Sequence, residues 1–168
     1  MSDFYGALIS TSFRVRDRAA FVADPAIVWL KQMVAHPLYN GFFQEDDQHP
    51  GYFAFGWNDQ YPDPVIKRPA TEADPPESRW EEDESFVAYD LLEVIQRHIL
   101  PGDVCRIQVS GQEKLLYVGG GLWWVTSRGI VDFDGHTHWD AKLTEAEFAK
   151  EVGDFHSQVA ALLAGGGE

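Results

Sequence analysis

The chain has 168 residues, of which 45% are hydrophobic and 14% aromatic, and it carries a formal net charge of −14. This composition is too apolar for a disordered acidic tail, and the length suits one domain that buries its own core. The negative charge argues against direct binding to nucleic acid, whose phosphates require Lys and Arg.

Residue types and helix-ending signals predict the first elements. β-branched and aromatic residues predict strands over 5–15 and 52–57, which are separated by a helix and an aromatic, acidic connection. The helix is expected to begin near Asp17 or at Asp24-Pro25, where a capping acceptor or a first-turn proline stands. It is expected to end at His36-Pro37.

The middle of the chain has a different composition. Residues 58–84 contain five prolines and no periodic apolar pattern. They predict a Pro-rich, acidic surface insertion with a short helical piece near 77–83, and loops of this length are usually functional or disordered. The amphipathic pattern of residues 86–100 then predicts the clearest helix, capped by Ser85 and ended by Pro101-Gly102.

The remaining chain predicts four short strands and a final helix. A turn is expected at Ser110-Gly111, and the glycines at 119–121 are expected to allow close backbone approach at a bulge. Thr144 begins a capping-box pattern that predicts a C-terminal helix at about 144–164. The four strands are expected at 104–109, 114–118, 122–126 and 130–133.

We therefore expect residues 1–168 to form a single α+β domain. The order of elements indicates an antiparallel sheet with helices packed on one face, a ferredoxin-like arrangement with extra strands and an acidic insertion. No apolar run approaches the roughly 20 residues that span a bilayer, and the first residues lack the features of a signal peptide. A cytoplasmic location without membrane contact is expected.

The negative charge is concentrated in residues 45–93, which contain fourteen acidic and three basic residues. Such a cluster attracts a basic protein groove, including one built to hold nucleic acid. The alternative is a solvated face that keeps the protein soluble. The acidic residues predicted to contact a partner are Glu45, Asp46, Asp47, Asp59, Asp63, Glu77, Glu81, Glu82, Asp83 and Glu84.

Two aromatic residues, Tyr61 and Trp80, stand among these acids and the prolines. Their setting is typical of a contact surface with aromatic anchors, so they are candidate partner-binding residues. The alternative, that they pin the insertion to the body of the domain, has equal weight. Both interpretations are open on sequence grounds.

No catalytic constellation emerges from the sequence. Cys105 lies in an alternating run and is expected to be a small buried apolar group. His136 and His138, with Asp134 and Asp140, form the best metal candidate, although a hydrated surface pair is the stronger expectation. We expect no metal and no cofactor, and a binding protein rather than an enzyme.

Five segments carry a family resemblance: Phe4-Tyr5-Gly6, Ser12–Asp17, Ala20-Phe21, Gly111–Gly119 and Val125–Gly129. They resemble small acidic accessory proteins of phages and plasmids, some labelled antirestriction-like, that have a YubB-like, ferredoxin-like domain. The resemblance implies a protein of a mobile genetic element. Acidic proteins of this kind often inhibit host defence systems by occupying their nucleic-acid grooves.

The leading hypothesis is an acidic binding protein of anti-CRISPR or antirestriction type. It would present carboxylates of residues 45–93 to the basic groove of a nucleic-acid-binding defence complex or nuclease. The alternative is an immunity or adaptor protein that binds a basic toxin or another protein through the same face. A metal-dependent enzyme or hydrolase that uses His136 and His138 has the least support.

Overall fold

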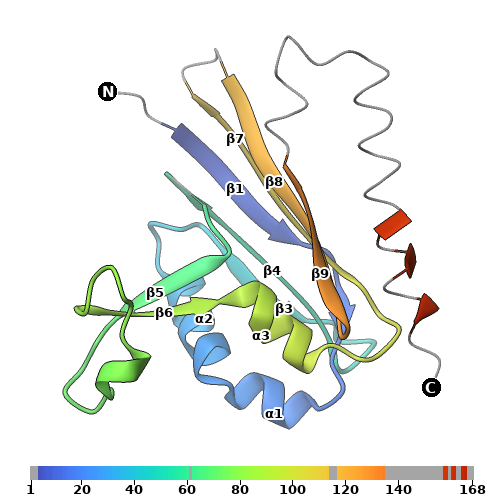
Figure 1. Cartoon of the computed structure of the whole chain (residues 1–168), viewed down its shortest axis with the longest axis horizontal. Helices are drawn as coiled ribbons and strands as arrows, with labels where there is room; N and C mark the ends of the chain where they lie inside the picture. The colour runs from blue at the N-terminus through green and yellow to red at the C-terminus, as the bar shows by residue number, and fades with distance from the viewer. Residues whose placement is uncertain are drawn as a thin grey trace.

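The computed structural model describes residues 4–60, 62–113, 117–134, 157–158, 160–161 and 164–165 (Figure 1). Within these residues the fold is mixed α+β. The helices are α1 (Arg18–Ala23), α2 (Pro25–Ala35), α3 (Leu91–His98) and the 3-10 helix η1 (Pro76–Ser78). The strands are β1 (Phe4–Ser10), β2 (Phe13–Arg14), β3 (Phe42–Glu45), β4 (Tyr52–Asp59), β5 (Val65–Pro69), β6 (Phe86–Asp90), β7 (Cys105–Glu113), β8 (Tyr117–Thr126) and β9 (Gly129–Asp134).

The main sheet has the order β2-β4-β1-β7-β8-β9, with β3 paired to β4, and all these pairings are antiparallel. β1 and β2 are two strands where the sequence predicted one over 5–15. The strand is interrupted after Ser10, whose hydroxyl accepts a hydrogen bond from the Phe55 N–H at 2.9 Å. Beyond this point Thr11 donates to the Arg106 carbonyl at 2.8 Å.

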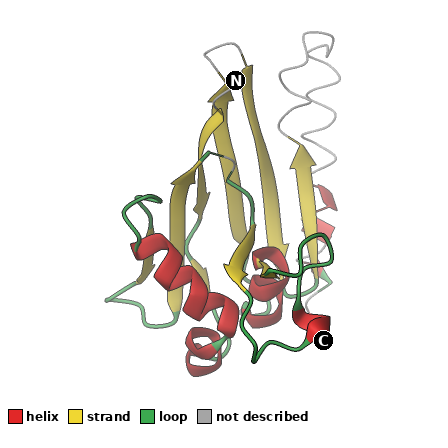
Figure 2. Ribbon diagram, turned by 90° about the vertical axis from the view of Figure 1, so that its left-hand side faces the viewer, coloured by secondary structure: helices red, strands yellow, loops and turns green. Residues whose placement is uncertain are grey.

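Buried side chains on one face of the sheet pack with the helices to form the core. Along β4, Phe53, Phe55 and Trp57 are buried because alternate residues of a strand point to the same face. They pack in one cluster with Phe21 of α1, whose ring lies 4.8 Å from that of Phe53, and with Leu30 of α2. The upper ends of β1, β7 and β8 extend beyond α1, α2 and α3 (Figure 2).

Aspartates begin the first two helices, as predicted from the capping pattern. Asp17 accepts a hydrogen bond from the Ala20 N–H at 2.9 Å and caps α1. Asp24 accepts one from the Ala26 N–H at 2.9 Å and caps α2, with Pro25 in the first turn. Both predicted starts are therefore used, and they produce two helices instead of one.

The predicted helix over 86–100 is wrong in its first part. Residues 86–90 form β6, which pairs antiparallel with β5 in a separate two-stranded sheet. α3 begins only after Asp90, whose carboxylate accepts a hydrogen bond from the Leu92 N–H at 2.9 Å, so Ser85 is not its cap. Phe, Val and Tyr favour an extended backbone when a partner strand is present, and here β5 supplies it.

The predicted insertion over 58–84 contains more regular structure than expected. β4 continues to Asp59, β5 follows, and η1 overlaps only the first two residues of the helical piece expected near 77–83. We call residues 65–90, which comprise β5, β6 and the loop between them, the excursion. It projects from one side of the molecule in Figure 1, on the left. The remaining described elements are called the body.

Ser110 and Gly111 do not form the predicted turn. β7 continues past them to Glu113, and the connecting residues 114–116 lie outside the described residues. The three glycines lie within β8, not at a bulge. A Cβ on Gly120 would lie 2.1 Å from the Val109 carbonyl oxygen, so the predicted close backbone approach does require glycine here.

Cys105 is fully buried, as predicted, and burial together with Asp103 raises the pKa of its thiol. Most of the predicted helix over 144–164 lies outside the described residues, although residues 157, 158, 160, 161 and 164 are helical. No helix in the described part of the chain has the length and apolarity needed to cross a bilayer.

Candidate protein-binding surface

Most of the predicted acidic residues form two groups, which lie beyond opposite ends of β4. Residues 45–47, which we call the turn group, comprise the last residue of β3 and the first two residues of its connection to β4. Residues 77–84, which we call the loop group, lie in the excursion that follows the other end of β4. The eight residues of β4 separate these two ends by roughly 23 Å, given the rise of an extended strand.

Two carboxylates of the turn group already have partners within the body. Glu45 forms a bidentate pair with Arg18, with both N–O distances 2.7 Å, and Asp46 accepts a hydrogen bond from the Gln48 N–H at 2.8 Å. The Arg18 hydrogen bond lowers the pKa of Glu45, and the Gln48 N–H lowers that of Asp46. Asp47 is exposed, and no described residue pairs with its carboxylate. The turn group therefore has mainly structural contacts.

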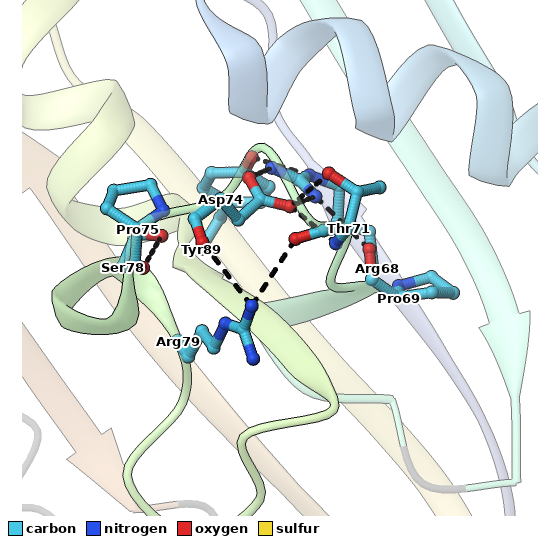
Figure 3. A network of polar contacts seen from close by, with 8 residues as sticks. All are labelled: Arg68, Pro69, Thr71, Asp74, Pro75, Ser78, Arg79 and Tyr89. Atoms are coloured by element: carbon cyan, nitrogen blue, oxygen red, sulfur yellow. Dashed lines mark hydrogen bonds and ion pairs between the residues drawn. The ribbon is translucent and has the colours of Figure 1, made fainter.

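A polar network joins the loop of the excursion to its two strands (Figure 3). Arg68 bonds both oxygens of Asp74 at 2.7 and 2.5 Å and donates to the Tyr89 hydroxyl at 2.9 Å. Asp74 also accepts from the N–H and hydroxyl of Thr71 at 2.8 and 2.9 Å. Arg79 reaches the carbonyl oxygens of Thr71 and Asp74 at 3.4 and 3.5 Å.

The charges within this network stabilise each other. Hydrogen bonds from Arg68 and then Thr71 hold the pKa of Asp74 well below its usual range. Asp74 and then Tyr89 raise the pKa of Arg68. The two charged side chains are only 23% and 14% exposed, so solvent screens their attraction less than that of a surface pair. The network therefore fixes the loop to β5 and β6.

The loop group presents charge from this fixed base. The backbone N–H of Trp80 donates to the Phe86 carbonyl at 2.8 Å. Asp83 accepts hydrogen bonds from the backbone N–H and the hydroxyl of Ser85 at 3.0 and 2.5 Å. The Ser85 contacts lower the pKa of Asp83. The other acids of the loop group are exposed, and no described residue makes a hydrogen bond or ion pair with them: Glu77, Glu81, Glu82 and Glu84.

A cavity of about 500 Å³ brings together predicted site residues from three segments. Asp59 ends β4, Asp63 precedes β5, and Trp80 belongs to the loop group. Tyr61 lies outside the described residues. The cavity is lined by Met33, Tyr39, Trp57, Asp59, Asp63, Val65, Ile66, Lys67 and Trp80.

Six of the nine lining residues were not predicted as site residues, and two of the six are Trp57 and Lys67. Trp57 shares a face of β4 with Asp59, and the alternation of strand residues could have indicated this. Lys67 lies with its ammonium 3.3 Å from the centroid of the Trp80 ring. Nothing in the sequence pointed to this contact, because residue 67 stood in a segment predicted to be irregular.

A second polar cluster joins two helices of the body. Asp24, with a side chain only 9% exposed, accepts hydrogen bonds from the side chains of His98 at 2.9 Å and Arg97 at 3.0 Å. Burial would raise the pKa of Asp24, but the hydrogen bonds from His98, Ala26 and Arg97 outweigh it and lower the pKa. The cluster links the start of α2 to the end of α3, which is a structural role.

Neither metal chemistry nor known relatives identify the protein. Within the described residues, no group of three or more His, Cys, Asp and Glu side chains could hold a metal ion. The predicted pair His136 and His138 lies outside those residues, as does Asp140. No protein-family model, curated protein or solved structure matches the chain.

Proposed function

We propose that this chain is an acidic binding protein that inhibits a nucleic-acid-binding host defence complex, of restriction or CRISPR type, by occupying its basic groove. The loop group is the observation that supports this proposal most. The exposed carboxylates of Glu77, Glu81, Glu82 and Glu84 have no partner among the described residues, and the network at Arg68 fixes the loop that carries them. Fixed charges lose less conformational freedom on binding, and complementary potentials speed encounter.

The proposal extends to the nature of the protein. It acts by binding rather than by catalysis, needs no cofactor, works in the cytoplasm and avoids direct contact with nucleic acid, which its charge of −14 repels. Its sheet and helices are a variant of the ferredoxin-like, YubB-like domain of mobile-element accessory proteins. The carboxylates of the loop group contact Lys and Arg side chains that would otherwise bind phosphates.

The proposal is tested by measuring, with fluorescence anisotropy, whether the protein displaces labelled DNA from restriction endonucleases and CRISPR complexes. The wild-type protein is expected to displace DNA from at least one of them, and less effectively as salt rises. The double variant Glu81→Lys, Glu82→Lys reverses two unpaired charges of the loop group. It should lose roughly tenfold or more in inhibition, because complementary charges become repulsive.

A second variant controls for net charge. Glu93→Lys with Asp132→Lys also changes the charge from −14 to −10, but at exposed positions of α3 and β9 outside the loop group. It should inhibit like the wild type, and thermal unfolding should show that both variants are folded. Equal losses in the two variants, or no displacement from any complex, would contradict the proposal. Binding to a basic toxin without displacement of DNA would favour the immunity-protein alternative.

A further inference from the structure

The cavity beside Trp80 has the chemistry of a site for an organic cation. Its walls include the aromatic side chains of Tyr39, Trp57 and Trp80, and the carboxylates of Asp59 and Asp63 also line it. Aromatic faces attract cations at distances up to roughly 6 Å, and carboxylates bond guanidinium and ammonium groups strongly. Its volume of about 500 Å³ is typical of pockets that enclose small ligands.

One aromatic wall of this cavity, the Trp80 ring, already contacts a cation, the ammonium of Lys67. This ammonium lies 3.3 Å from the centre of the Trp80 ring, and Lys67 itself lines the cavity. Two carboxylates and one ammonium leave the lining with a negative charge. An incoming cation would therefore gain attraction from Asp59 and Asp63, whereas an anion would meet net repulsion.

Two other hollows of similar volume lack this combination. The hollow beside the turn group, about 550 Å³, has one aromatic residue, Tyr52, and the carboxylates of Glu45, Asp46 and Asp47. Glu45 and Asp46 already bond Arg18 and local backbone N–H groups. The hollow between α2 and the excursion, about 500 Å³, has aromatic walls but no carboxylate, and Arg68 contributes a positive charge. Of these three, only the cavity beside Trp80 joins three aromatic side chains to carboxylates that no Arg or Lys pairs with in the described structure.

We propose that this cavity binds the side chain of an arginine or lysine on the partner protein. The apolar stem of such a side chain suits Met33 and Ile66, and its charged head suits Asp59 and Asp63. Trp80 directly precedes the exposed Glu81 and Glu82 of the loop group, so one basic side chain can enter the cavity while its neighbours meet that loop. The identity of the occupant as a partner residue rests on the proposed function.

Titration with N-acetyl-arginine methylamide, followed by ¹⁵N NMR, tests the cavity without any partner. The indole N–H signals of Trp57 and Trp80 are expected to shift, and the citrulline analogue, which has the same shape without the charge, should cause much smaller shifts. Asp59→Asn with Asp63→Asn should weaken binding roughly tenfold or more, because it removes the charge-assisted bonds. Asp47→Asn, at the other end of β4, is the matched control and should change nothing.

A Lys67→Met variant separates cation from anion binding. If the ligand is a cation, losing the competing ammonium should leave its affinity unchanged or raise it. If the cavity instead binds N-acetyl-glutamate methylamide, and loses that binding in Lys67→Met, the assignment is wrong. Equal shifts with the citrulline analogue, or arginine binding that survives both Asn substitutions, would also overturn it.

The two proposals can fail separately. The arginine derivative requires only the cavity, whereas DNA displacement requires the loop group and a target. Failure of the cavity with intact, charge-dependent inhibition leaves the proposed function standing without an arginine-binding pocket. Specific binding of the arginine derivative with no inhibition of any complex keeps the cavity and removes the defence inhibitor.

Discussion

The body and the excursion are stabilised by different forces. Buried aromatic and aliphatic side chains from the main sheet and three helices form the core of the body. Within residues 65–90 only Ile66 and Val87 are buried hydrophobic residues, and the loop is fixed mainly by Arg68 and Asp74. A two-stranded sheet alone is marginal in water, so the polar network and the packing of Ile66 into the core both matter.

This difference separates folding from binding. A surface that must expose carboxylates cannot also bury much apolar area, and a bidentate ion pair can order such a loop without covering its charges. Changes in the exposed acids should therefore alter binding with little effect on the body. Changes in the core should lower the stability of the body with little effect on the charges available for binding. Substitutions in each region can test that separation.

The largest effect is expected from the core of the body. Phe21 is fully buried and touches the rings of Phe13 and Phe53, so Phe21→Ala should leave a cavity and reduce the free energy of unfolding by about 4 kcal/mol. Denaturant unfolding measures this loss. Val28 of α2 is 42% exposed, so Val28→Ala is the control and should change the free energy of unfolding by less than about 1 kcal/mol. Similar losses would mean that burial does not distinguish these sites.

A smaller and more local effect is expected from Arg68→Ala. Without the guanidinium, Asp74 and Tyr89 lose their shared partner, and backbone amides of the excursion should exchange with solvent roughly tenfold faster. Amides of β4 and β7 should keep their protection. Arg18→Ala, which removes a surface pair in the body, should leave exchange in the excursion unchanged. Faster exchange throughout the body would show that the two regions unfold together.

Much of the body could be predicted from local sequence patterns. Capping aspartates at positions 17 and 24 place the starts of α1 and α2, because a cap involves residues only two or three positions apart. The alternation of Phe53, Phe55 and Trp57 in the same way predicts β4 and its buried face. Such features depend on neighbours along the chain, which the sequence displays directly.

The excursion and the cavity depend on distant partners. Residues 86–90 have apolar positions that fit a helix as well as a strand, and only pairing with residues 65–69 decides for the strand. The contact between Lys67 and Trp80 likewise needs the loop to turn back over β5. For the acids, sequence identified the charge but could not separate Glu45, which pairs with Arg18, from the unpaired Glu81.

The smallest effect concerns acid pH. The pKa of Asp74 is lower in the folded protein than the value of about 3.9 for an unfolded chain, so its contribution to the excursion is complete above that pH and is lost as pH falls through the folded pKa. In Arg68→Ala the main cause of the shift is gone, and the pKa of Asp74 should rise toward its usual range. Carboxyl ¹³C titration measures both values. Asp46, whose low pKa depends on the Gln48 N–H, should titrate identically in the two proteins. An unchanged Asp74 titration would mean that Arg68 does not hold the excursion, and the contrast between a polar-stabilised excursion and an apolar body would then fail.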